Sequence, residues 1–213
     1  MAYSQQIITN FYTIIMKHLI LSLLILLPFV TNAQKDVTKF LGIPVDGTKS
    51  EMIQKLKAKG FKSSYYDKEI LEGEFNGARA TIMIQTNNNK VWRIIVSYSN
   101  LSEQNAKTRF NNLCYQFQNN SKYYSAGADY TIPDSDDISY EMSVNEKRYE
   151  GLYIQCSERN LNIATDDYSK HLFDNNYDAN KIVWFALLQY NPMEYSIAIY
   201  YENGYNQANG EDL

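Results

Sequence analysis

The chain has 213 residues, two histidines and two cysteines, and its 20 Lys and Arg against 24 Asp and Glu give it a net charge of −4. Its longest basic cluster is the dipeptide Lys147-Arg148, so the sequence gives no reason to expect nucleic acid or an anionic membrane surface as a partner. The few His and Cys side chains argue against a zinc site.

The amino-terminal segment has the layout of a secretory signal peptide. Met16 and a lysine precede an apolar run over 19–30, and small residues end at Ala33 as they do before a cleavage site. The run is too short to cross a bilayer, which takes about 20 apolar residues. Residues 1–33 are therefore expected to be an upstream extension and signal peptide, with the true start at Met16 and cleavage after Ala33. A genuinely longer leader is the alternative.

Residues 34–213 would then form a single domain that is periplasmic or secreted. No cysteine stands directly after the signal core, so lipid attachment to an amino-terminal cysteine is not expected. No second long apolar run is present in the sequence, so no transmembrane anchor is expected after signal removal.

The first half of this domain, about 36–100, predicts one helix followed by an antiparallel meander. Thr48 and Glu51 form a capping box that starts the helix, and Gly60 supplies its left-handed end. Asn76-Gly77 is a strong hairpin signal. Strands are expected over 70–76, 78–86 and 91–98, and alternation predicts a shared face for Trp92, Ile94, Val96 and Tyr98.

The second half, about 101–205, repeats this order over a longer stretch. Ser102 caps a helix whose apolar stripe runs to about Asn119. The expected strands are 138–144, 148–156, 181–190 and 195–201, with a polar loop over 158–181. The fold class is thus α+β, with two helix-plus-antiparallel-meander units and the helices packed on one face of the sheet.

The two cysteines lie on apolar faces that helix and sheet would bury against each other. Cys114 belongs to the stripe of the second helix, and Cys156 to the apolar face of the strand over 148–156. In an oxidising compartment this placement favours a disulfide between them. Two buried, unpaired thiols are the alternative, and burial argues against a redox role because reactive cysteines need partial exposure.

Catalytic chemistry is restricted mostly by what the sequence lacks. His171 is the only histidine outside the leader, and it sits in a polar stretch typical of a solvated loop. No nucleophile elbow or phosphate-binding glycine loop occurs. Some carboxylates remain as candidates for hydrolysis or calcium binding, although acids in such loops are usually just solvated. They are Asp134, Asp136, Asp137, Glu141, Asp166 and Asp167. No catalytic residue, metal or cofactor is predicted.

Tyrosine is the unusual residue, with 19 copies. Tyrosine fits half-buried sheet surfaces, so strand propensity explains most of them. Exposed tyrosines also make good binding surfaces because the side chain is rigid and amphipathic. The candidates for a ligand or partner surface are Tyr65, Tyr66, Tyr123, Tyr124, Tyr200 and Tyr205.

Several stretches resemble a family of uncharacterised secreted proteins of gut Bacteroidetes. They are residues 40–48, 56–61, 71–77 and 197–203. The family carries no activity or catalytic motif to transfer. More distantly, the helix-plus-meander order is similar to that of β-lactamase-inhibitor-protein-like folds and of small envelope assembly lipoproteins. This sequence differs from the lipoproteins because it lacks their lipid-attachment cysteine.

These observations favour a non-enzymatic binding module of the cell envelope that holds an envelope protein or a glycan. The alternative is a carboxylate-dependent hydrolase acting on glycan or peptidoglycan, which would need two acids facing each other across a cleft.

Overall fold

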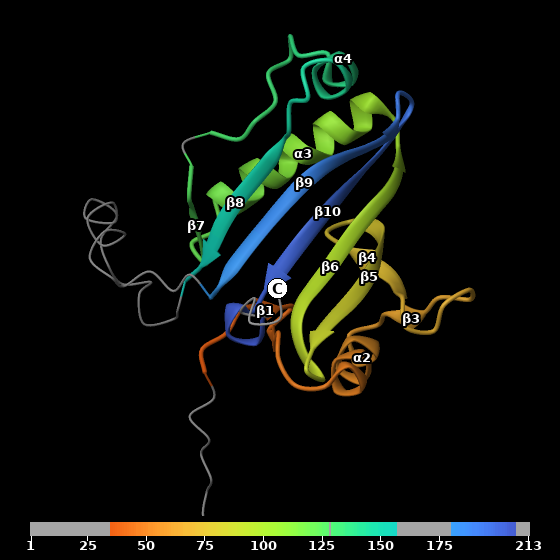
Figure 1. Cartoon of the computed structure of the whole chain (residues 1–213), viewed down its shortest axis with the longest axis vertical. Helices are drawn as coiled ribbons and strands as arrows, with labels where there is room; N and C mark the ends of the chain where they lie inside the picture. The colour runs from red at the N-terminus through yellow and green to blue at the C-terminus, as the bar shows by residue number, and fades with distance from the viewer. Residues whose placement is uncertain (1–34, 128, 157–179, 208–213) are drawn as a thin grey trace, which may run out of the picture. The chain divides into compact units, whose positions relative to one another are not determined.

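An eight-stranded antiparallel sheet dominates the computed structural model, which describes residues 35–127, 129–156 and 180–207 (Figure 1). Its strand order is β3-β4-β5-β6-β10-β9-β8-β7, and β1 and β2 pair separately. The elements are β1 Lys39–Phe40, β2 Ile43–Pro44, α2 Lys49–Ala58, β3 Lys62–Ser63, β4 Leu71–Phe75, β5 Ala78–Asn87, β6 Lys90–Leu101, α3 Glu103–Gln118, β7 Tyr123–Ser125, α4 Ile138–Ser143, β8 Glu150–Gln155, β9 Ile182–Asn191, β10 Glu194–Glu202 and the 3-10 turn η3 Gly204–Asn206.

The local signals of the first half are confirmed. The Thr48 hydroxyl accepts from the Glu51 amide at 3.3 Å, and the Glu51 carboxylate accepts from the Thr48 amide at 2.9 Å, which is the predicted capping box. Asn76 and Gly77 take φ values of 51° and 72° and turn β4 into β5. Positive φ at both positions suits the twist of a two-residue hairpin, so this turn sets the register of the two strands.

The alternation predicted for β6 fails at Trp92. Gln85 pairs with Arg93 and Thr86 with Val91, so Trp92 is an extra residue in a β-bulge. Val91 is fully buried in the core, whereas the Arg93 guanidinium lies 4.0 Å above the Trp92 ring. Trp92 and Arg93 therefore both project from the face opposite the core, and the prediction that Trp92 shares a face with Ile94 is wrong.

The strand predicted over 138–144 is also wrong, because this stretch forms helix α4. The Asp137 carboxylate accepts from the Tyr140 amide at 2.9 Å and caps the helix. Ile138 and Met142, which looked like alternating strand positions, are also four residues apart and both pack toward the core. A short apolar run satisfies both periods, and the cap decides in favour of the helix.

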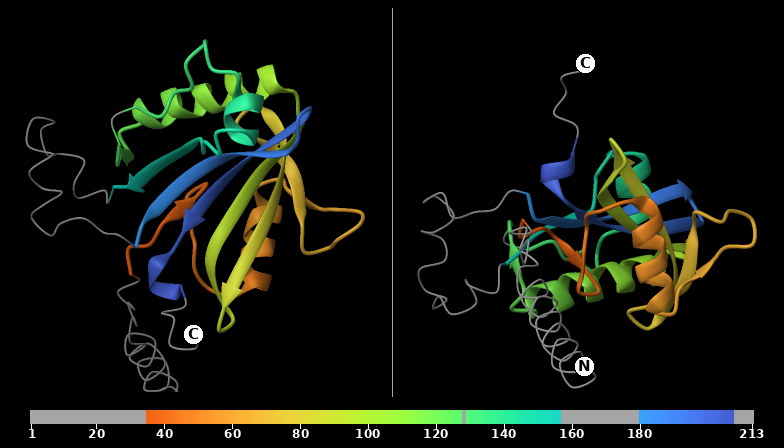
Figure 2. Two further views of the ribbon diagram at one scale, coloured as in Figure 1. Left: turned by 45° about the horizontal axis from the view of Figure 1, so that its top comes forward. Right: turned by 90° about the horizontal axis from the view of Figure 1, so that it is seen from below.

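The helices α2 and α3 pack on the same face of the sheet (Figure 2). Buried side chains of both, including Met52, Leu56, Phe110 and Phe117, belong to one core cluster with inward-facing strand residues. The α+β class with an antiparallel sheet is confirmed. Because one sheet runs continuously from β3 to β7 and Asp36–Leu213 clusters as one compact unit, the division into two repeated units stays a prediction.

Some predictions fall outside the described residues. They are the upstream extension and signal peptide over 1–33, with Met16 and Ala33, and the polar-loop residues Asp166, Asp167 and His171. Among the helices that the structure does describe, none is long and apolar enough to cross a bilayer.

Candidate functional site

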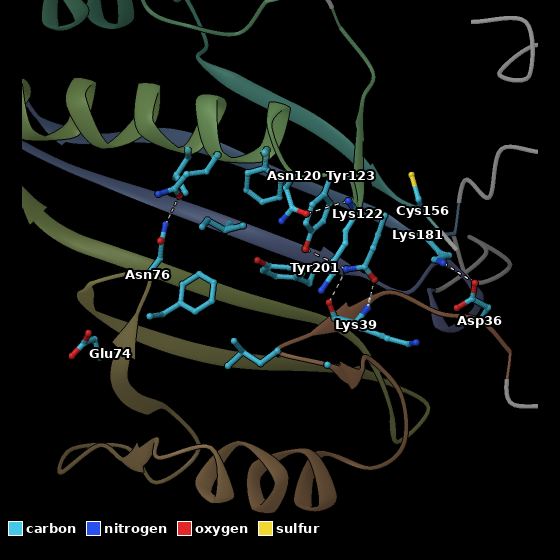
Figure 3. A pocket seen from close by; sticks show the side chains of 18 residues that line it. Asp36, Lys39, Glu74, Asn76, Asn120, Lys122, Tyr123, Cys156, Lys181 and Tyr201 are labelled. Carbon is cyan, nitrogen blue, oxygen red and sulfur yellow. Dashed lines mark hydrogen bonds and ion pairs between the residues drawn. The ribbon is translucent and has the colours of Figure 1, made fainter. Parts of the chain in front are cut away.

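A groove of about 790 Å³ crosses the helix-bearing face of the sheet (Figure 3). One wall is α3 and the other is the β1–β2 hairpin, while the β4–β5 turn closes one end and the ends of β7 and β8 lie at the other. Its lining residues are Asp36, Lys39, Leu41, Gly42, Glu74, Phe75, Asn76, Leu113, Gln116, Phe117, Asn120, Lys122, Tyr123, Gln155, Cys156, Lys181, Ile199 and Tyr201.

The hairpin wall is held in place by one ring and one side-chain amide. Phe40 is fully buried, with its ring centroid 5.2 Å from that of Phe75 and 4.8 Å from that of Tyr201. The Lys39 amide donates to the Gln155 side-chain oxygen at 2.6 Å, and the Gln155 nitrogen donates back to the Lys39 carbonyl at 3.0 Å. These contacts fix β1 against β8 and leave Leu41, which is 40% exposed, at the rim.

The α3 wall combines apolar and amide side chains. Leu113 and Phe117 are four residues apart and reach the floor, and Gln116 and Asn120 form a polar edge above them. The Gln116 oxygen accepts from the Asn76 side chain at 2.6 Å, and the Asn120 oxygen accepts from the Lys122 amide at 3.1 Å. Within the part of the chain that the structure describes, the side-chain nitrogens of Gln116 and Asn120 have no hydrogen-bond partner, so both can donate to a ligand.

The two ends of the groove differ in charge. Three ammonium groups, on Lys39, Lys122 and Lys181, line the end beside β7 and β8. Among the described residues that line this end, the acid is Asp36, which pairs with Lys181 at 2.8 Å. Glu74 lies at the opposite end (Figure 3). Lysines therefore outnumber acids among the described residues that line the lysine end.

Tyr123 is the one predicted surface tyrosine that lines this groove. Its ring packs edge-on against Phe117 at 4.7 Å, and its hydroxyl accepts from the Gln155 side chain at 3.2 Å. Burial raises the pKa of Tyr123, and burial raises the pKa of the neighbouring Tyr201 well above its ordinary value. Both phenols consequently stay neutral and available for hydrogen bonding across the physiological pH range.

The other predicted tyrosines lie in separate places. Tyr65 and Tyr66 are 85% and 94% exposed in the loop between β3 and β4. Tyr124 lies half-buried in β7, and Tyr205 lies in η3. Tyr200 stacks on Trp184 at 3.9 Å on the face of the sheet opposite the helices.

Tyr200 is part of a connected cluster of aromatic and charged side chains on that opposite face. The Glu202 carboxylate accepts from Arg93 at 2.5 Å and from the Trp184 indole at 2.7 Å. The Arg93 guanidinium lies between the rings of Trp92 and Tyr200, at 4.0 Å and 5.3 Å from their centroids. Arg93 Nε is buried without a hydrogen-bond partner among the described residues, but the other contacts of this set link side chains of β6, β9 and β10 and hold these strands together.

The acidic residues in and before α4 form hydrogen bonds and ion pairs that stabilise the surrounding structure. Asp136 accepts from the Lys147 ammonium at 2.7 Å and from the Tyr149 hydroxyl at 2.9 Å, and these bonds lower the pKa of its carboxyl group. Asp137 caps α4, and Glu141 accepts from Asn145. The Lys107 ammonium binds the backbone carbonyls of Asp134 and Asp136. Across the described residues, no group of three His, Cys, Asp or Glu side chains is arranged to hold a metal ion.

The predicted disulfide is not formed in the structure. Cys114 is a fully buried residue of α3, whereas Cys156 directly follows β8 and lines the groove with partial exposure. Burial raises the pKa of the Cys114 thiol to about 12. The face of β8 that packs against α3 is that of Tyr153, which is fully buried and whose hydroxyl donates to the Cys114 carbonyl at 3.5 Å. Leu152, on the alternate face that was predicted to be apolar, is 37% exposed, so helix and sheet do not bury the two predicted faces against each other.

Sequence reasoning missed the amide edge and the lysine end of the groove. A signal for the first was present, because Gln116 and Asn120 sit four residues apart beside the apolar stripe of α3. The comparisons with known proteins identify no relative: no family model, no curated protein and no solved structure matches the chain.

Proposed function

We propose that the protein is a non-enzymatic binding module of the cell envelope, and that its groove holds a segment of an acidic glycan. The observation that carries this proposal is the groove itself, in which an apolar floor, a row of amide side chains and an excess of lysines lie together. The envelope location rests on the signal peptide predicted over residues 1–33.

The amphipathic lining favours a sugar over a purely apolar ligand. A pyranose ring presents apolar C–H faces and a polar rim of hydroxyl groups. The groove offers apolar contacts on Phe75, Leu113 and Phe117, with the unpaired amide nitrogens of Gln116 and Asn120 above them. Both halves of a sugar therefore find matching groups in one site.

The lysine end favours an acidic glycan over a neutral one. Lys122 is exposed, and it lines this end together with Lys39 and Lys181, where Asp36 is the acid among the described lining residues. A carboxylate on the ligand would gain a charge-assisted contact there, which is stronger than a contact between neutral groups.

The acids of the groove favour binding without hydrolysis. Glycoside hydrolysis uses two carboxyl groups about 5–9 Å apart on either side of the scissile bond. Asp36 and Glu74 are the acids that line the groove, and they lie at its opposite ends (Figure 3). Asp36 is also engaged by Lys181.

Calorimetry with a matched pair of oligosaccharides tests the proposal. The acidic ligand is the peptidoglycan tetrasaccharide of alternating N-acetylglucosamine and N-acetylmuramic acid without peptides, and the neutral control is the tetramer of N-acetylglucosamine. We expect the acidic tetrasaccharide to bind more tightly and to be recovered intact by mass spectrometry. Equal or absent binding of the two would overturn the proposal, and recovery of cleaved sugar would replace it with the hydrolase.

A charge reversal in the groove adds a site-specific readout. Lys122→Glu should abolish the preference for the acidic tetrasaccharide. Lys90→Glu makes the same charge change at an exposed position at the start of β6 and should leave binding unchanged. Loss of binding in both variants would point to a general charge effect and against the groove.

A further inference from the structure

The most exposed aromatic side chains of the described sheet domain lie together on one loop. Tyr65 and Tyr66 are 85% and 94% exposed, and their rings meet edge to face at 5.3 Å. The loop joins β3 to β4 and extends beyond the edge of the sheet beside α2 (Figures 1 and 2). We call residues 64–70 the tyrosine loop.

The tyrosine loop is braced from within. The Ser64 amide donates to the Ile70 carbonyl at 2.8 Å, and the Ser63 hydroxyl donates to the Lys68 carbonyl at 3.1 Å. The Glu69 amide donates to the Asp67 carboxylate at 2.8 Å, and Glu69 pairs with Lys49 of α2. The two rings are thus presented on an ordered segment, which reduces the entropy lost when they bind.

Positive charge gathers next to the loop. Five exposed lysines and two exposed acids, Asp67 and Glu69, occur between positions 55 and 70, and Glu69 is paired with Lys49, although the chain as a whole is acidic. The lysines are Lys55, Lys57, Lys59, Lys62 and Lys68. Salt screens charges beyond about 10 Å, so a contacting surface responds to this local excess and only weakly to the net charge of the whole protein.

We propose that the tyrosine loop and these lysines form a docking surface for an anionic lipid bilayer. Tyrosine rings favour the boundary between headgroups and acyl chains, and lysines next to them attract lipid phosphates. A protein partner is the weaker reading, because lysine is depleted in protein interfaces and the two rings project outward from a loop. This proposal goes beyond glycan binding and uses a different part of the molecule.

Vesicle cosedimentation of the full exported chain tests it. The probes are phosphatidylcholine vesicles and vesicles in which about one third of the lipid is phosphatidylglycerol. We expect the protein to pellet with the anionic vesicles only, and to be released at high salt. Equal recovery with both kinds of vesicle, or recovery with neither, would overturn the proposal.

Matched variants assign the binding to this surface. Replacing Tyr65 and Tyr66 by serine should lower the partition coefficient at least fivefold, and Lys57→Glu should lower it about fivefold because one lysine contact is lost. The control replaces Tyr190 and Met193 by serine, which removes comparable exposed apolar side chains (67% and 87% exposed) from the end of β9 and from the β9–β10 turn. The proposal is contradicted if the variant without Tyr65 and Tyr66 binds anionic vesicles as well as the unaltered protein does. It is also contradicted if the protein does not bind vesicles but captures a partner protein through these tyrosines.

Discussion

The side-chain amide of Asn76 donates to the side-chain oxygen of Gln116 at 2.6 Å, across 40 positions of sequence. This bond ties the β4–β5 turn to the last turn of α3 and closes one end of the groove. It also fixes which atom of Gln116 faces a ligand, because the oxygen is used by Asn76 and the nitrogen remains to donate.

Gln116→Ala should weaken glycan binding more than it weakens the fold. The residue is exposed, so loss of its bond to Asn76 should cost about 1 kcal/mol or less in the free energy of unfolding. Loss of the donor should lower affinity for the acidic tetrasaccharide about fivefold. Gln104→Ala, at an exposed position near the start of α3, is the control. Calorimetry and thermal melting measure both quantities, and equal affinity of the two variants would contradict the assignment of Gln116.

Cys114 should resist thiol reagents in the folded protein. Its side chain is fully buried and burial raises its pKa to about 12, so the reactive thiolate is absent near neutral pH. Alkylation followed by peptide mass spectrometry should find Cys114 unmodified in native protein and modified in denaturant. Equal labelling under both conditions would show that α3 does not seal this part of the core.

Stability should fall at alkaline pH because several buried groups must keep their protons. Burial raises the pKa of Cys114 from 9.0, and of Tyr98 and Tyr149 from 10.0, to about 12 in each case. The folded state therefore binds more protons than the unfolded chain above pH 9, so this contribution is complete below that pH and is lost as pH rises toward 12. Urea unfolding across this range measures the loss. Cys114→Ala should make the decline shallower, and an unchanged slope would contradict this origin.

Glu202→Leu should destabilise the protein by about 2 kcal/mol, because it leaves the Arg93 guanidinium partly buried without its carboxylate. The two side chains are only 21% and 11% exposed, and the Trp184 indole loses its acceptor as well. Arg79→Ala removes the Arg79–Glu72 pair, in which Arg79 is 83% exposed, and should cost less than about 1 kcal/mol. Chemical denaturation compares the two, and equal losses would show that burial does not set the strength of the Arg93 contact.

The correct predictions are those in which neighbouring residues decide the structure. Thr48 and Glu51, or Asn76 and Gly77, carry their signal within four positions, and the structure confirms both. The strand predicted over 138–144 was wrong because Ile138 and Met142 fit both the strand period and the helix period. Only the cap at Asp137 decides for the helix.

Features that depend on contacts between residues far apart in the sequence could not be predicted from local sequence patterns. The bulge at Trp92 appears only when β6 is set against β5, and the sequence of β6 alone reads as regular alternation. The groove is assembled from six separate stretches of the chain, which no periodicity links; they lie around Lys39, Asn76, Gln116, Gln155, Lys181 and Tyr201. Its tyrosine, Tyr123, was singled out by residue type, while the lysines around it were not.

β10, the last strand that the structure describes, lies at the centre of the sheet, between β6 and β9. The first four strands of the sheet and the strands after α3 therefore have no direct hydrogen-bonded connection until β10 enters between them. A polypeptide still being synthesised cannot make that connection before residue 202 has left the ribosome. Joining of the two half-sheets therefore waits for β10. A chain that stops before β10 would hold two unjoined half-sheets with exposed edges, the kind of species that aggregates.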